Sequence, residues 1–126
     1  MTARDETVIR RLSALADADI EQLAALLIDC VEGGASVSFM HPLTYDRASA
    51  FWRRIADDVA AGRKMLFAAV DAGGIVGTVQ LILDLLENQP HRADIAKMLV
   101  HRRARRRGIG AALMRAAEDE IGRAHV

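Results

Sequence analysis

Cysteine is scarce in this chain, charge of one sign is not in excess, and long apolar runs are absent. The single cysteine, Cys30, excludes a disulfide within the chain and favours a reducing compartment such as the cytoplasm. The 17 basic side chains balance 17 acidic ones, so no overall field draws the protein to nucleic acid. No apolar run reaches the length of a membrane span, and the charged N-terminal segment lacks a signal-peptide core. We therefore expect a cytoplasmic protein without nucleic-acid or membrane partners.

Length and composition fit one folded unit. The 126 residues are 52% hydrophobic, which is enough for a core of ordinary size. We see no internal repeat, low-complexity segment or linker, so we expect residues 1–126 to form a single domain. Cys30 falls among apolar residues at helical spacing, which predicts a small buried hydrophobe rather than a reactive thiol. The four histidines are scattered and form no metal motif.

Apolar periodicity and turn signals predict three helices and four strands. The expected strands cover residues 8–12, 64–70, 75–86 and 92–100. The expected helices start at Asp17, at a cap formed by Thr44 or Asp46, and near Gly108. They end at Gly33, Gly62 and Arg123, respectively. The order strand, helix, helix, three strands, helix indicates an α+β fold in layers, with a mixed, mainly antiparallel sheet flanked by helices.

Three apolar or small residues within these elements carry specific expectations. Phe51 and Trp52 belong to the apolar stripe of the second helix, where core packing is more common than a ligand box. Gly77 interrupts an apolar strand, which indicates a bulge or a close approach of another backbone.

The most informative stretch runs from Asp94 to Met114, where an apolar strand enters a turn with five arginines in positions 102–107. Gly108 and Gly110 follow, and a strong helix former takes over at once. The first N–H groups of a helix lack intrahelical partners and lie at the positive end of its dipole. A phosphate or pyrophosphate would be held well there. Two other interpretations stay open from these residues alone: a solvated turn, and a nucleic-acid patch.

The spacing Arg105-x-x-Gly108-x-Gly110 resembles the Arg/Gln-x-x-Gly-x-Gly/Ala signature of the GCN5-related N-acetyltransferases. The approach through residues 97–100 most resembles the small bacterial branch of that family. The resemblance implies an acyl-CoA N-acyltransferase-like fold, with acetyl-CoA as co-substrate. It also implies a set of cofactor-binding residues, in which the strand meets the pantetheine arm and thioester and the turn cradles the pyrophosphate. These residues are Met98, Leu99, Val100, Arg105, Arg106, Arg107, Gly108, Ile109, Gly110 and Ala111.

The resemblance also predicts that the C-terminal part of the domain is missing. In the family a fifth strand follows the cofactor helix, and a later tyrosine protonates the CoA thiolate. Here the chain ends where that strand is expected, and its one tyrosine, Tyr45, matches no catalytic position. A strand with an open side pairs readily with other chains, so we expect a homo-oligomer formed through the exposed C-terminal edge.

For function, the resemblance implies transfer of an acetyl group to a primary amine of a small molecule by direct attack. The amine must lose a proton, and Asp94 is the first candidate base, with Asp84 and Glu87 as alternatives. Strand alternation predicts that Asp94 shares a face with Ala96, Met98 and Val100. The alternative function is a truncated, non-catalytic module that binds CoA or a protein partner. The acceptor itself cannot be inferred from the sequence.

Overall fold

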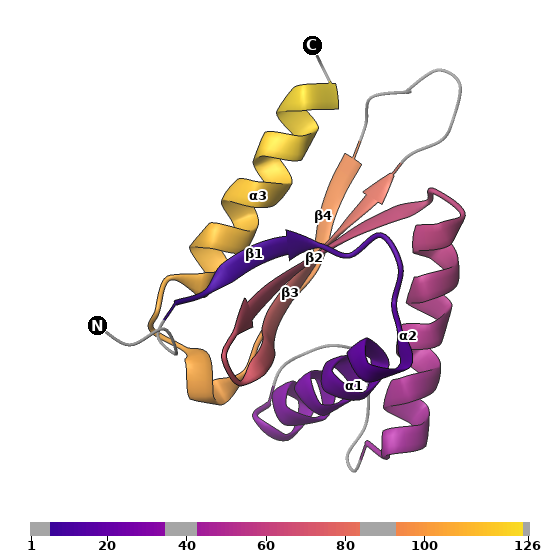
Figure 1. The fold of residues 1–126 in the computed structure, drawn as a ribbon, viewed down its shortest axis with the longest axis vertical. Coiled ribbons are helices and arrows are strands. Elements are labelled where there is room, and N and C mark those ends of the chain that lie inside the picture. The colour runs from indigo at the N-terminus through magenta and orange to yellow at the C-terminus, as the bar shows by residue number, and fades with distance from the viewer. Residues whose placement is uncertain (1–5, 35–42, 84–92, 125–126) are drawn as a thin grey trace.

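The computed structural model describes residues 6–34, 43–83 and 93–124, and these form one antiparallel sheet between two helical layers (Figure 1). The sheet has the order β1-β2-β3-β4, and every neighbouring pair is antiparallel. Helices α1 and α2 cover one face, and α3 covers the other. The elements are β1 (Val8–Arg11), α1 (Asp17–Glu32), α2 (Tyr45–Ala60), β2 (Lys64–Asp71), β3 (Gly74–Leu83), β4 (Ala93–Val100), the short 3-10 helix η2 (Arg102–Ala104) and α3 (Ile109–Ala124). The α+β class and the order of elements are therefore confirmed.

The helix ends follow local chemistry. The Thr44 hydroxyl accepts a hydrogen bond from the Arg47 N–H at 3.2 Å, so Thr44 rather than Asp46 caps α2. At α1 the cap position is Ala16, whose N–H donates to the Asp19 carboxylate at 2.9 Å. Gly33 follows the last residue of α1, as predicted. The expected end of the third strand at 84–86 lies outside the described residues.

Two separate cores lie on the two faces of the sheet. On the α1/α2 face, Trp52 and Cys30 are fully buried, and Phe51 packs edge-on against Trp52 with ring centroids 5.1 Å apart. On the α3 face, residues of β2 and β3 pack against Ile109, Leu113 and Ala117. Phe51, Trp52 and Cys30 therefore belong to the core, as the sequence predicted.

Helix α3 packs tightly against the sheet at Gly77. A Cβ atom at Gly77 would lie 3.0 Å from the Leu99 carbonyl oxygen, 3.1 Å from Ile109 Cγ2 and 3.2 Å from Leu113 Cδ1. The register also shifts beside it, since Ala69 pairs with Gly77 while Val70 pairs with Ile75. The missing side chain thus lets the beginning of α3 dock, which confirms the expected close approach.

Three buried polar side chains belong to elements of the α1/α2 layer and of the sheet. Trp52 Nε1, Thr78 Oγ1 and both polar atoms of the Gln80 amide have no hydrogen-bond partner within the described part of the chain. Gln80 is 1% exposed and pairs in register with Leu66 and Ala96. A buried, unpaired amide lowers the free energy of unfolding, because water satisfies it only in the unfolded chain.

Replacing Gln80 with leucine is therefore expected to stabilise the fold by about 1–3 kcal/mol. The matched control is Gln22→Leu, because the Gln22 Oε1 accepts a hydrogen bond from the Ile75 N–H at 2.8 Å and its loss should destabilise. Urea unfolding of the three proteins measures both effects. Equal or lower stability of the Gln80 variant would contradict the prediction.

Candidate functional site

The candidate site is the connection between β4 and α3. After β4 the chain forms η2, whose Ala104 is fully buried and fixes the connection to the protein. Two residues in the left-handed region then turn the chain into α3: Arg106 at φ 68° and Gly108 at φ 73°. Left-handed backbone is easy for glycine and unusual for arginine, so this turn has a defined shape rather than that of a loose loop.

The beginning of α3 is open to an incoming anion. The first backbone bond of the helix joins the Ala112 N–H to the Gly108 carbonyl at 3.0 Å. The N–H groups of Ile109, Gly110 and Ala111 therefore have no acceptor among the described residues. A Cβ atom placed on Gly110 would meet nothing within 4 Å, so packing within the protein does not require a glycine at this position. Free N–H groups, the helix dipole and empty space are together the features that favour the binding of an anion.

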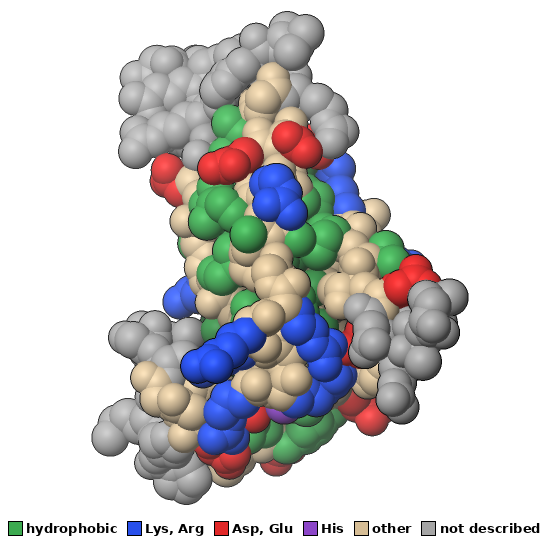
Figure 2. Space-filling view, turned by 90° about the vertical axis from the view of Figure 1, so that its left-hand side faces the viewer, with side chains coloured by type: hydrophobic (Ala, Val, Ile, Leu, Met, Phe, Trp, Pro, Cys, Tyr) green, Lys and Arg blue, Asp and Glu red, His purple; other side chains and the backbone are tan. Residues whose placement is uncertain are grey.

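Basic side chains gather around this helix end (Figure 2). Three of the five arginines are held by carboxylates: Arg102 by Asp29 at 2.9 Å, and Arg103 and Arg107 by Asp71 at 3.2 and 3.1 Å. These two carboxylates were not predicted from the sequence.

The other two arginines keep free donor groups. Arg105 donates its Nε to the Val100 carbonyl at 3.4 Å and also lies within hydrogen-bonding range of the Cys30 thiol. Arg106 has no hydrogen bond or ion pair within the described residues. Of the predicted arginines, Arg105 and Arg106 are thus available to a ligand, while Arg107 faces Asp71.

The two carboxylates are charged at neutral pH. Hydrogen bonds from Arg103, and then from the Gly73 N–H and Arg107, hold the pKa of Asp71 below its usual 3.8 although burial opposes them. Burial raises the pKa of Asp29, but hydrogen bonds from Arg102 outweigh it and the pKa is lowered overall. Because both pKa values are lowered on folding, this contribution to stability exists above pH 3.8 and disappears as the pH falls through the folded-state values.

A bulge in β4 decides which way the predicted residues of that strand face. Ala96 pairs with Gln80 and Leu99 pairs with Thr78, so Lys97 and Met98 together oppose Val79. Lys97 adopts φ 56°, and the alternation is reset at this point. Leu99 consequently packs in the α1/α2 core, whereas Met98 and Val100 pack in the α3 core.

This bulge corrects one prediction about Asp94. Asp94 pairs with Ile82, which places it on the same face as Ala96 and Leu99. The expectation that it shares a face with Met98 and Val100 is wrong, because simple alternation ignores the extra residue. Asp94 is exposed, and the alternatives Asp84 and Glu87 lie outside the described residues.

A pocket of about 500 Å³ adjoins the beginning of α3 on the side of β1. Arg107 and Arg115 are its basic lining residues, and no pattern in the sequence predicted this pocket. Its lining consists of Thr7, Ile9, Arg107, Gly108, Ile109, Ala112 and Arg115.

None of the described helices is long and apolar enough to cross a bilayer.

Comparisons with known proteins agree with this geometry. A family model described as the acetyltransferase (GNAT) family matches residues 21–125. A solved GCN5-related N-acetyltransferase from Kribbella flavida is 25% identical with a TM-score of 0.67, and the match covers 93% of this chain and 66% of that one. This chain belongs to the acetyltransferase (GNAT) family, because the family model covers most of its length.

Two further solved structures share the fold. A ribosomal-protein-alanine N-acetyltransferase from Brucella melitensis is 20% identical with a TM-score of 0.70, covering 92% of this chain and 67% of that one. The PaiA N-acetyltransferase from Thermoplasma acidophilum, solved in complex with coenzyme A, is 12% identical with a TM-score of 0.67. The match covers 94% of this chain and 73% of that one. Acetyl-CoA is the co-substrate of this family. The chain spans about two thirds of the length of the first structures that it matches.

Proposed function

We propose that this chain carries the acyl-CoA site of an N-acetyltransferase that transfers an acetyl group from acetyl-CoA to a primary amine of a small molecule. The observation that carries the proposal is the open N-terminus of α3, where Gly110 faces empty space. Arg105 and Arg106 keep free donors beside it. Membership of the GNAT family supports the choice of a CoA pyrophosphate over other anions.

The turn before α3 and the strand β4 bind different parts of the cofactor. The N–H groups of Ile109, Gly110 and Ala111 bind the pyrophosphate, with Arg105 and Arg106 supplying full charges. The backbone of β4 from Met98 to Val100 lies along the pantetheine arm, because no described strand pairs with the outer edge of β4. The bulge at Lys97 interrupts the regular pairing of β4 with β3 just before this segment. Acetyl-CoA supplies the acetyl group as a thioester.

For proton transfer we propose Asp94 as the base that receives the proton of the acceptor amine, directly or through water. It lies on the α1/α2 face of β4, whereas Met98 and Val100 pack on the α3 face. The acceptor amine would therefore approach β4 from the side of α1 and α2. Asp94 is exposed.

Calorimetric titration of acetyl-CoA into the purified 126-residue chain tests the cofactor site. Desulfo-CoA and a short DNA duplex serve as comparators. We expect both CoA compounds to bind and the duplex not to bind, because the site fits one pyrophosphate and the chain has no net charge. Absence of acetyl-CoA binding would contradict the proposal, and tight binding of the duplex would favour a nucleic-acid role for the arginines.

A second candidate function is a non-catalytic module that binds CoA or a partner. Its support is the outer edge of β4, which pairs with no strand in the described part of the chain. Consumption of acetyl-CoA with a panel of small amines distinguishes an enzyme from such a module. The same open edge supports our proposal of a homo-oligomer, which light scattering across a tenfold dilution series would test. We also propose a cytoplasmic location, on the support of the single cysteine.

A further inference from the structure

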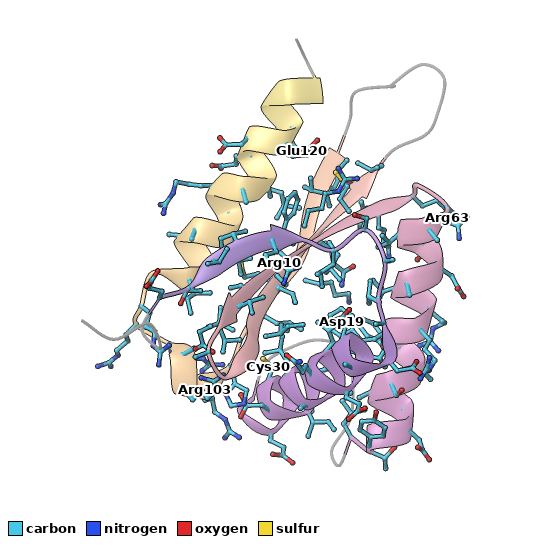
Figure 3. The ribbon with its side chains drawn as sticks, viewed as in Figure 1. Arg10, Asp19, Cys30, Arg63, Arg103 and Glu120 are labelled. Atoms are coloured by element: carbon cyan, nitrogen blue, oxygen red, sulfur yellow. The ribbon has the colours of Figure 1, made fainter. Side chains whose placement is uncertain are left out.

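One buried carboxylate joins two distant parts of the chain beside the proposed cofactor site. Asp71 ends β2, and its side chain is only 2% exposed. Its Oδ1 accepts from the Gly73 N–H at 2.8 Å and from Arg103 Nη2 at 3.2 Å. Its Oδ2 accepts from Arg103 Nη1 at 3.2 Å and from Arg107 Nη1 at 3.1 Å. The end of β2 is thereby tied to Arg103 and Arg107, which are 32 and 36 positions further along the chain. Figure 3 labels Arg103 beside the turn between β2 and β3.

The two arginines that Asp71 holds bracket the ligand-facing part of the turn. Between Arg103 and Arg107 lie Arg105 and Arg106, which keep free donors. Arg107 Nη2 also donates a hydrogen bond to the Arg103 carbonyl oxygen at 3.5 Å, which links the two ends of this segment directly. Gly108 follows immediately at φ 73° and begins α3. Arg103 and Arg107 therefore belong to the segment of backbone that leads directly into the first N–H groups of α3.

The arginines of the turn also differ in whether a carboxylate compensates their charge. Without carboxylates, five arginines in positions 102–107 would repel one another. Asp29 compensates Arg102, and Asp71 compensates both Arg103 and Arg107. Partly buried ion pairs are screened less by salt than exposed ones, so this division persists at ordinary ionic strength.

We propose that Asp71 is a positioning residue for the acyl-CoA site: it fixes Arg103 and Arg107 so that Arg105, Arg106 and the start of α3 are presented to the pyrophosphate. The inference rests on the proposed function. It implies that acetyl-CoA meets two uncompensated guanidinium groups in an ordered turn. Removing the Asp71 charge would add net positive charge to the turn and loosen its shape.

The test is calorimetric titration of acetyl-CoA into Asp71→Asn at several salt concentrations. We expect the dissociation constant at ordinary ionic strength to rise about tenfold, the size of one lost charge-assisted contact. We also expect a steeper dependence of that constant on salt, because two guanidinium groups lose their compensating charge. A purely structural role would lower thermal stability without steepening the salt dependence.

Asp58→Asn is the matched control. Asp58 likewise pairs two basic side chains, Arg63 at 2.8 Å and Lys64 at 3.3 Å, but it lies at the end of α2. Its variant should lose comparable stability and bind acetyl-CoA with wild-type affinity and salt dependence. Asp71→Glu keeps the charge and should recover part of the affinity.

The variant pair Arg103→Gln and Arg107→Gln tests the mechanism even if Asp71→Asn does not fold. Since Asp71 is proposed to act through these arginines, the double variant alone should weaken acetyl-CoA binding by about as much as Asp71→Asn, about tenfold. Wild-type affinity in the double variant, or wild-type affinity and salt dependence in Asp71→Asn, would overturn the inference. No binding by the wild-type chain would overturn the proposed function as well, which separates the two failures.

Discussion

Replacing Gly110 with leucine is expected to raise the dissociation constant for acetyl-CoA by about a hundredfold, which corresponds to roughly 3 kcal/mol. The position has ordinary backbone geometry and empty space above it, so the leucine side chain occupies the volume that the pyrophosphate needs. It would also cover the N–H groups of Ile109 and Ala111. Gly108 is a poorer choice, because its φ of 73° means that any side chain strains the turn itself.

Gly122→Leu is the control for this experiment. Gly122 lies in the same helix, and a Cβ atom there also meets nothing within 4 Å. Both substitutions improve helix propensity to a similar degree, so stability should rise or stay constant in each. Calorimetric titration should then show loss of binding only for the Gly110 variant. Wild-type affinity in that variant would exclude the beginning of α3 as the pyrophosphate site.

The second large effect concerns Gly77. Substitution by valine is expected to lower the free energy of unfolding by about 3 kcal/mol, because overpacking forces backbone and side chains apart. The new atoms would press on the Leu99 carbonyl, Ile109 and Leu113, all at 3.0–3.2 Å from a Cβ atom alone. Since Ile109 begins α3, acetyl-CoA binding should weaken together with stability.

A second substitution shows whether the contact with α3 is the cause. Leu113→Ala alone should cost about 2–5 kcal/mol by leaving a cavity. Combined with Gly77→Val, it provides space for the valine, so the pair should be more stable than the sum of the single losses by about 0.5–3 kcal/mol. Chemical denaturation of the four proteins gives this coupling. Strict additivity would mean that Gly77 is needed for another reason, such as the conformation of β3.

Features set by neighbouring residues could be predicted from the sequence. The cap at the start of α2 depends on residue types that are visible within one short stretch, which offered Thr44 and Asp46 as candidates. The Arg105-to-Gly110 spacing likewise identified both the family and the turn. In these cases the physical cause lies within a few positions of the residue concerned.

Features that depend on contacts across the fold could not be predicted. The partners of Asp71 lie 32 and 36 residues away, and no local pattern distinguishes this aspartate from others in turns. The bulge at Lys97 leaves no signal either, since lysine rarely adopts φ 56°. One unrecognised extra residue was enough to move Asp94 to the opposite face from Met98 and Val100.

The layering of the two cores has a consequence for motion. Among the described elements, α3 alone covers its face of the sheet, and its first turn is also the proposed anion site (Figure 1). Detachment of this one helix is then a local opening event that exposes one core and leaves the other closed. A ligand that binds only the docked helix opposes that opening by mass action. Amide hydrogens of α3 should therefore exchange more slowly when acetyl-CoA is bound, while those of α1 change little.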